Sequence, residues 1–281
     1  MPGDSARSRL AGTRFADVRW VAETGSTNAD ALALARDGER EGVVVVADHQ
    51  TAGRGRFGRS WQDEPGSALL ASVLLRPAAE VAPLATTALG VAAVEAVAEV
   101  AGVEVRLKWP NDLVVGPDHP AADRKLAGIL AEADWPTGSS ASSGYRPPAR
   151  GERVVVVVGI GLNLRWPVGV PEELADRAVA LDELAPAPVE REDLLVALLG
   201  RLAVRYAELG SPGGAAVLHR RAVELSATLG RRVRVDVGRE DVFGTAVDLT
   251  VEGRLVVETA DGRRTLDAGD VVHLRPGAPG S

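Results

Sequence analysis

Three arginines and three glycines alternate in GRGRFGRSW, residues 53–61. Arg54, Arg56 and Arg59 offer closely spaced guanidinium groups, which bind phosphate or carboxylate oxygens through paired, charge-assisted hydrogen bonds. The glycines between them let the backbone approach a ligand closely. The stretch therefore predicts a loop that holds an anion, and the simpler alternative is a solvated basic turn.

Further charged residues follow in KWPND, residues 108–112, and KLAG, residues 125–128. Lys108 can neutralise a phosphate, and Asp112 can hold a hydrated Mg²⁺ ion. Lys125 begins an apolar run, so its long side chain can place a cation at the edge of a buried surface. Each motif also has a simpler interpretation when taken alone. Asp112 could be hydrogen-bonded only within its own turn, and the aliphatic part of the Lys125 side chain could simply cover apolar surface.

Uncharged polar residues add two more groups. GSTN, residues 25–28, precedes an alanine-rich run, and the spacing of Thr27 and Asp30 favours helix capping as their role. GIGLN, residues 159–163, follows five valines, so a ligand can lie against the glycine backbone while Asn163 offers a donor and an acceptor. Together these five stretches, which form four clusters when KLAG and GIGLN are counted as one, predict a site for a polyanion.

Hydrophobic periodicity predicts the elements that must position these residues. Helical patterns cover residues 28–37, 83–101, 192–209 and about 213–229. Strand patterns are VVVVAD, SALLASVLLRP, VRLKW, DLVVG, KLAGILAEADW and RVVVVVGIGLNL. After Gly230, five short strand-like pieces predict a small β-barrel.

The three glycines of the loop also match G-x-G-x-x-G, the fingerprint of dinucleotide-binding folds. That fingerprint requires the third glycine to open a helix whose amides meet a pyrophosphate. Pro65 and Gly66 interrupt the chain first, and a strand pattern follows. A Rossmann fold is therefore not expected.

Composition limits the compartment and the partners. The 281 residues suit one large domain plus a small one, and no run approaches the roughly 18 apolar residues of a membrane span. A net charge of −7 argues against broad nucleic-acid binding. The absence of cysteine and of a signal sequence agrees with the cytoplasm. We expect a flexible tail over residues 1–15, a large domain over 16–229 and a barrel over 230–276, with a mobile loop at 136–152.

The motifs, in this order, resemble those of the biotin protein ligases: STN, Q-x-x-GRGRxGRxW, KWPNDL, KLAGIL-x-E, GIGxN and a small C-terminal barrel. The resemblance spans nearly the whole chain, and GRGRFGRSW and KWPNDL about fifty residues apart are together highly specific. It implies an α+β fold: a mixed, mostly antiparallel sheet packed with helices, of the class II synthetase type, plus an SH3-like barrel. It also implies a two-step reaction, in which ATP and Mg²⁺ convert biotin to biotinyl-5′-AMP and a lysine of a carrier domain then accepts the biotinyl group.

Site residues carry over from the resemblance one by one. The implied biotin-binding residues are Ser26, Thr27, Asn28, Gln50, Gly53, Arg54, Gly55, Arg56, Lys125, Gly128 and Gly159. The implied ATP-binding residues are Arg56, Arg59, Trp61, Lys108, Asn111, Lys125 and Asn163. Lys125, Arg56 and Lys108 are expected to be catalytic, and Asp112 is the candidate Mg²⁺ ligand.

The resemblance implies a partner as well, the biotin carboxyl carrier domain of an acyl-CoA or pyruvate carboxylase. Some family members carry an N-terminal DNA-binding domain, but only 25 residues precede Ser26, so we expect a monofunctional cytoplasmic ligase that binds no DNA. We expect a monomer or a weak homodimer. The alternatives are a lipoate or octanoate protein ligase, against which GRGRxGRxW argues, and a non-catalytic ligand-binding or DNA-binding regulator.

Overall fold

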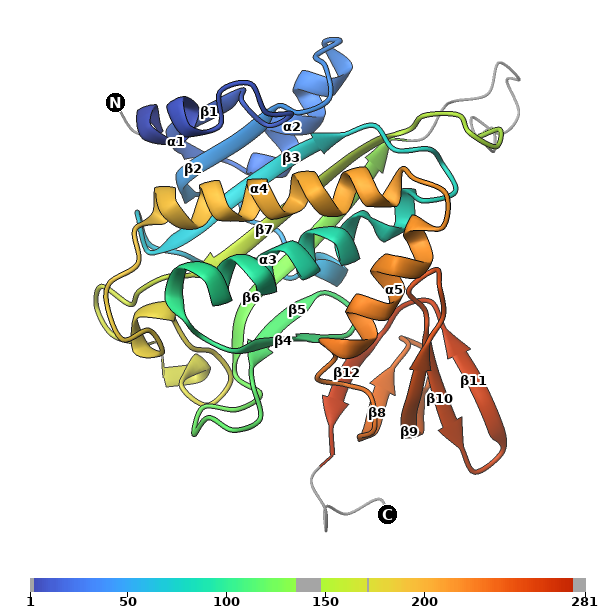
Figure 1. Cartoon of the computed structure of the whole chain (residues 1–281). Helices are drawn as coiled ribbons and strands as arrows, with labels where there is room; N and C mark the ends of the chain where they lie inside the picture. Colours follow the sequence, from blue (N-terminus) through green and yellow to red (C-terminus); the bar gives the residue numbers. More distant parts are fainter. Residues whose placement is uncertain (1–2, 135–147, 171, 275–281) are drawn as a thin grey trace.

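A seven-stranded sheet forms the centre of the larger part of the molecule (Figure 1). The computed structural model describes residues 3–134, 148–170 and 172–274. The strands, in the spatial order β1-β2-β3-β7-β6-β5-β4, are β1 (Val18–Thr24), β2 (Val44–Gln50), β3 (Ala68–Leu75), β7 (Val155–Asn163), β6 (Lys125–Asp134), β5 (Asp112–Val115) and β4 (Val105–Lys108). β1 and β2 run parallel, and all other neighbours run antiparallel. This confirms the predicted mixed, mostly antiparallel sheet.

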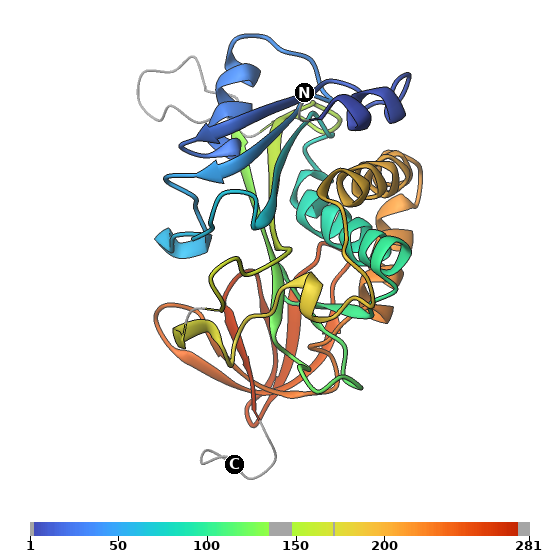
Figure 2. The same ribbon diagram turned by 90° about the vertical axis from the view of Figure 1, so that its left-hand side faces the viewer.

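Helices cover both faces of this sheet, as Figure 2 shows. On one face, α3 (Ala85–Ala101) packs against α4 (Arg191–Leu209), and α5 (Gly214–Glu224) contacts both. On the other face, α2 (Thr27–Arg36) buries Ala31 and Ala35 against valines and a leucine of β2, β3 and β7. Small alanine side chains let the helix lie close to the strands, which brings its N-terminus to the sheet surface.

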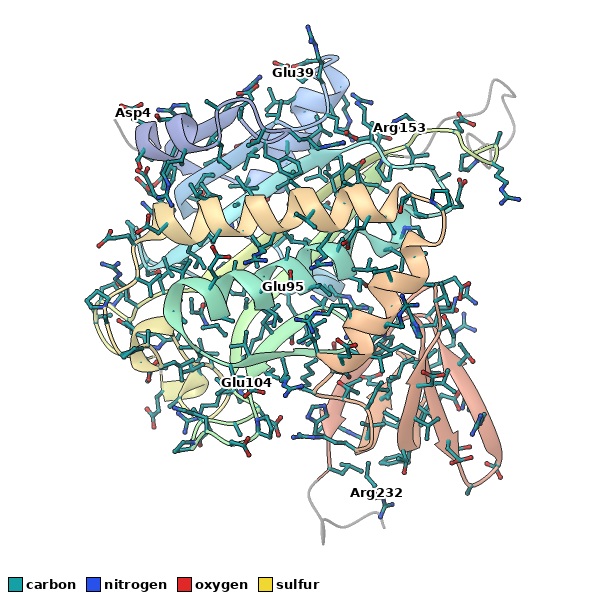
Figure 3. The ribbon with its side chains drawn as sticks, in the orientation of Figure 1. Asp4, Glu39, Glu95, Glu104, Arg153 and Arg232 are labelled. Carbon is teal, nitrogen blue, oxygen red and sulfur yellow. The ribbon has the colours of Figure 1, made fainter. Side chains whose placement is uncertain are left out.

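The core helix α3 is almost entirely apolar. Among the described residues, Ala82–Ala101 is the one segment long and apolar enough for a membrane span by length and composition, and 67% of its window is buried in the fold. Glu95, labelled in Figure 3, accepts hydrogen bonds from Arg205 of α4 and Arg221 of α5. Packing against the sheet and these helices accounts for the apolar character of α3.

A second, five-stranded antiparallel sheet, called the C-terminal sheet here, follows α5. Its order is β11-β10-β9-β8-β12, and its strands are β8 (Arg232–Asp236), β9 (Asp241–Leu249), β10 (Leu255–Thr259), β11 (Gly262–Leu266) and β12 (Asp270–His273). Alternating residues such as Val233, Val235, Leu255 and Val257 are buried, which is the period expected of strands with one face inward. The five predicted strand-like pieces are confirmed as strands.

The flexible tail predicted for residues 1–15 is wrong for residues 3–15. This segment contains α1 (Asp4–Arg9), and Ala6, Leu10 and Phe15 are buried. Glu192 of α4 accepts hydrogen bonds from the backbone N–H groups of Gly3 and Ala6. A carboxylate there satisfies amides at the start of a helix and complements its dipole, so the segment docks on α4.

The end of α5 differs from the sequence prediction, and the predicted mobile loop is not tested. The predicted helix over 213–229 ends at Glu224, because the following residues pair with β4: the Leu107 N–H donates to Leu225, and the Ala227 N–H donates to Leu107. The insert at 136–152, expected to be mobile, falls largely outside the described residues.

Candidate active site

A cavity of about 400 Å³ lies between the main sheet, the loop of residues 53–61 and the C-terminal sheet. This volume is in the range of small-molecule sites. It collects nearly all of the predicted site residues: Ser26, Thr27, Asn28, Gln50, Arg54, Gly55, Arg56, Arg59, Trp61, Lys108, Asn111, Asp112, Lys125, Gly128 and Gly159. Segments as far apart in sequence as Ser26 and Asp270 thus meet around one space, as the polyanion-site prediction requires.

A buried network of uncharged polar groups forms part of the wall. The Ser72 hydroxyl oxygen on β3 lies 2.7 Å from Thr27 Oγ1 and 2.6 Å from Asn28 Oδ1. The Thr27 N–H donates to Gln50 Oε1 at 2.8 Å, and Asn28 Nδ2 donates to Glu132 Oε2 at 2.8 Å. Because these partners hold one another, the donors and acceptors that face the cavity are fixed before any ligand binds.

The favoured capping interpretation of GSTN is wrong. Ser26 is the N-cap residue of α2, but its side chain makes no capping hydrogen bond. The Thr27 hydroxyl donates to Gln50 Oε1, and Asp30 accepts a hydrogen bond from Thr24. The polar side chains at the start of α2 are therefore turned toward the cavity network and β1 rather than toward the helix amides.

Glycines line the cavity because no side chain fits there. A Cβ atom at Gly159 would lie 2.1 Å from Asn28 Oδ1, and one at Gly161 would lie 2.6 Å from the Trp61 ring. At Gly128 a Cβ would meet the Lys125 ammonium at 3.0 Å. The Trp61 Nε1 atom is buried and has no hydrogen-bond partner in the described part of the chain.

The loop of residues 53–61 is held at its base and along its length. The Trp61 N–H donates to the Gly53 carbonyl at 2.9 Å, so Gly53 closes the base of the loop and does not line the cavity. Arg54 pairs with Glu132 of β6 at 3.1 Å. The loop contains a single 3₁₀ turn, Arg56–Gly58, and the next element is a strand antiparallel to β2, which excludes the Rossmann arrangement.

The cationic side chains sit at the junction of β4, β5 and β6. The Lys125 ammonium forms an ion pair with Asp112 at 2.7 Å. Burial lowers the pKa of Lys108 below its usual range, although Asp112 opposes that shift. Burial also lowers the pKa of Arg56, against the charges of Asp270 and Asp112. Cations that burial deprives of water gain more from an incoming anion than exposed ones do.

Asp112 fits a magnesium role only with help from substrate. No cluster of three or more His, Cys, Asp and Glu side chains able to hold a metal occurs among residues 3–134, 148–170 and 172–274. Mg²⁺ commonly takes one or two protein carboxylates and completes its shell with phosphate oxygens and water. One carboxylate beside a cationic pocket suits an ion that arrives with a phosphate.

Asn163 does not line the cavity, contrary to its predicted contact with ATP. Its side-chain amide is buried and donates to the Val179 carbonyl at 3.1 Å. Nearby, the Lys125 N–H donates to the Arg177 carbonyl at 2.8 Å. The Val179 N–H in turn donates to the Lys125 carbonyl. Asn163 thus helps to hold residues 177–179 beside Lys125.

Several residues of the site were missed from sequence. Ser72 is the one polar residue in the buried run ALLASVLL, and a buried hydroxyl there was a usable signal. Glu132 is the last residue of the KLAGIL-x-E motif. Arg177 and Asp270 line the cavity but lie outside every motif, so no local pattern pointed to them.

Comparisons with known proteins agree with this geometry. Residues 24–137 match the biotin/lipoate A/B protein ligase family, and residues 228–274 match the biotin protein ligase C terminal domain. The chain is 37% identical to a biotin–acetyl-CoA-carboxylase ligase of Mycobacterium tuberculosis, over 96% of this chain and 95% of that protein. The chain belongs to the biotin protein ligase family.

Other members of the biotin protein ligase family are similar over comparable lengths. A biotin–acetyl-CoA-carboxylase ligase of Paracoccus denitrificans is 31% identical, over 89% of this chain and 98% of that protein. The biotin protein ligase of Aquifex aeolicus in complex with biotin and ATP superimposes with a TM-score of 0.72, at 26% identity, covering 93% of this chain and 100% of that chain. Sequence and fold therefore agree on the family.

Proposed function

We propose that the cavity activates biotin with ATP and then transfers it to protein. Membership of the family makes the chain an enzyme that attaches biotin to protein at the expense of ATP. The observation that carries the proposal for this cavity is the meeting of a fixed, uncharged polar network with a cluster of half-buried cations around one space. A lipoate or octanoate ligase is not favoured, because the matched relatives are biotin ligases.

The uncharged network is our candidate for holding the ring system of biotin. The ureido group of biotin offers one carbonyl acceptor and two N–H donors. Hydroxyl and amide groups of Thr27, Asn28, Gln50 and Ser72 can both donate and accept, so they can match that pattern. The glycine backbone at 159 and 161 lets Asn28 and the Trp61 ring lie directly against β7, at the side of this network.

The cations are our candidates for the first chemical step. A carboxylate oxygen of biotin attacks the α-phosphorus of ATP, the bond to the β-phosphate oxygen breaks, and pyrophosphate leaves. Both reactants are anions, so positioned cations lower their repulsion and stabilise the charge on the phosphate. We assign this role to Lys125, Lys108 and Arg56. Lys125 would give up its ion pair with Asp112 and contact the reacting oxygens instead.

Bound Mg²⁺ would neutralise phosphate charge, and Asp112 is the residue of this chain that we assign to hold it. Asp112 already faces Lys125 across 2.7 Å, so the same carboxylate lies within reach of the phosphate site. Arg59, Trp61 and Asn111 also line the cavity and are our further candidates for the nucleotide side.

The second step transfers the biotinyl group to a lysine amine. The neutral amine attacks the carbonyl carbon of biotinyl-5′-AMP, the bond to the phosphate oxygen breaks, AMP leaves, and the nitrogen releases a proton to water. The mixed anhydride reacts with water, so a loop that covers it protects the intermediate. We infer that the acceptor is a biotin carboxyl carrier domain of a carboxylase and that the reaction takes place in the cytoplasm.

Isothermal calorimetry with biotin and then ATP tests this proposal, alongside an assay of pyrophosphate release. We expect biotin to bind the wild type and pyrophosphate to appear only with both substrates. The Arg56→Ala variant is expected to lose adenylate formation. Binding of lipoate or octanoate in place of biotin would contradict the substrate assignment.

A further inference from the structure

The loop of residues 53–61 contacts the C-terminal sheet at the turn that precedes β12. Arg56 Nη1 donates to the Gly269 carbonyl at 3.2 Å, and Arg59 Nη2 pairs with Asp270 Oδ1 at 2.7 Å. Figure 2 shows the loop, in light blue, projecting from the main sheet. We propose that Gly269 and Asp270, called the latch here, hold the loop closed over the adenylate. In this proposal Asp270 is a positioning residue that acts by binding Arg59. This inference rests on the proposed function.

The turn at Gly269 is packed closely against β8. A Cβ atom at Gly269 would lie 2.6 Å from Val235 Cγ1 and 2.9 Å from the Asp236 carbonyl oxygen. Asp270 begins β12 and pairs there with Asp236 of β8. The Gly269 carbonyl and the Asp270 carboxylate are therefore presented to the loop from a packed sheet edge rather than from a free turn.

The other end of β12 reaches the turn that carries Lys108. His273 Nδ1 lies 2.8 Å from Arg231 Nη1, and its Nε2 lies 3.3 Å from Thr228 Oγ1, which accepts the Trp109 N–H at 3.1 Å. Arg231 donates to Nδ1, so in the neutral ring Nε2 carries the proton. β12 thus contacts the arginine loop directly and is linked to the KWPND turn through Thr228.

The contribution of Asp270 alone is expected to be moderate. Both members of the Arg59–Asp270 pair are partly exposed, and such pairs are weakened by solvent. Removing the carboxylate charge is therefore expected to change closure a few-fold, and reversing it should change closure more, because a lysine would repel Arg59 and Arg56. The Arg54–Glu132 pair remains in every variant.

The test measures escape of the intermediate. The full-length protein is loaded with biotin and ATP labelled in the α-phosphate, and release of labelled biotinyl-5′-AMP is followed after a chase with unlabelled ligand. We expect release about 3-fold faster for Asp270→Asn and about 10-fold faster for Asp270→Lys than for wild type. Asp267→Asn is the matched control, because Asp267 precedes the same turn but pairs with Arg254 inside the C-terminal sheet.

Trypsin cleavage of the loop in the ligand-free protein gives an independent readout, because Arg54, Arg56 and Arg59 are all cleavage sites. Cleavage after Arg54 and Arg56, resolved by mass spectrometry, should accelerate in the Asp270 variants and slow again when Arg59→Asp is combined with Asp270→Arg; these two sites are present in every variant. Calorimetry confirms that each variant is folded. The latch would be overturned if Asp270→Lys released biotinyl-5′-AMP and was cleaved by trypsin at the wild-type rates. It would also be overturned if Asp267→Asn raised both rates as much as the Asp270 variants do. Failure of the wild type to form any adenylate would overturn the proposed function, while the trypsin rates would still decide on the latch.

Discussion

Two parts of the cavity wall differ in how their polar groups are satisfied. In the uncharged network, Thr27, Asn28, Gln50 and Ser72 are buried or half-buried and hydrogen-bond mostly to one another. In the cationic part, the charges are balanced by the protein's own carboxylates, such as Asp112 opposite Lys125. The first region is built to receive a ligand without rearrangement. The second must exchange internal ion pairs for ligand contacts.

That difference separates the expected effects of substitution. Changes in the cationic part should act on the chemical step, where charge develops, and changes in the uncharged network should act on biotin affinity. Four experiments would break or sharpen this contrast.

The largest effect is expected for Lys125→Ala. Removing the cation that we assign to the reacting phosphate should lower the rate of adenylate formation about 10²–10³-fold, with little change in biotin affinity. Pyrophosphate release measures the rate, and calorimetry measures the affinity. Arg124→Ala is the neighbouring control, because Arg124 does not line the cavity and should leave the rate near wild type. A loss below tenfold for Lys125→Ala would contradict its role.

Gly159→Ala should come next and should act through binding. Its Cβ would lie 2.1 Å from Asn28 Oδ1, so the network must shift, and overpacking of this kind costs about 1–3 kcal/mol. We expect biotin affinity to fall about 30-fold while the protein stays folded. Gly200→Ala in α4 is the matched control, since its added Cβ meets nothing within 4 Å apart from the adjoining backbone of its own helix. Equal affinity for the two variants would show that Gly159 is not beside the ligand.

Ser72→Ala should have a smaller effect of the same kind. The change removes the hydroxyl that lies between Thr27 and Asn28, leaving their side chains less fixed, at a cost of about 1 kcal/mol. Biotin affinity should fall about fivefold, and ATP affinity should stay unchanged. A matching loss in ATP affinity would mean that the two parts of the wall are not independent.

The smallest expected effect is on thermal stability, in the Lys108→Met variant. Burial lowers the pKa of Lys108 in the folded protein, so the charged form destabilises the fold. This cost is present below the folded pKa and is relieved as pH rises through it toward the unfolded value. Lys108→Met should therefore raise Tm by about 2–4 °C at neutral pH while lowering activity. Calorimetry at neutral pH and near pH 10 checks this, because the gain should shrink at the higher pH.

Sequence patterns were most informative where the conformation of a residue depends on its neighbours in sequence. The strands around the cavity follow from runs such as VVVVVGIG, and Gly102 ends α3 in a left-handed conformation, as its position after an alanine-rich helix predicts. The glycine–arginine loop and the KWPND turn were also readable, because dense charge and glycine at a strand end have few structural explanations.

By itself, the sequence determined most of the strands and helices, although not α1 or β1. It also determined the composition of the loop and the residue types at the centre of the site, because these depend on periodicity and on neighbours within a few positions. Tertiary structure alone decided how the polar start of α2 is used, since Thr27 meets Gln50 and Ser72 rather than helix amides. It also turned Asn163 away from the cavity and brought Asp270 to it. These outcomes depend on which distant strand lies alongside, and a hydrogen bond between residues far apart in sequence leaves no local pattern to read.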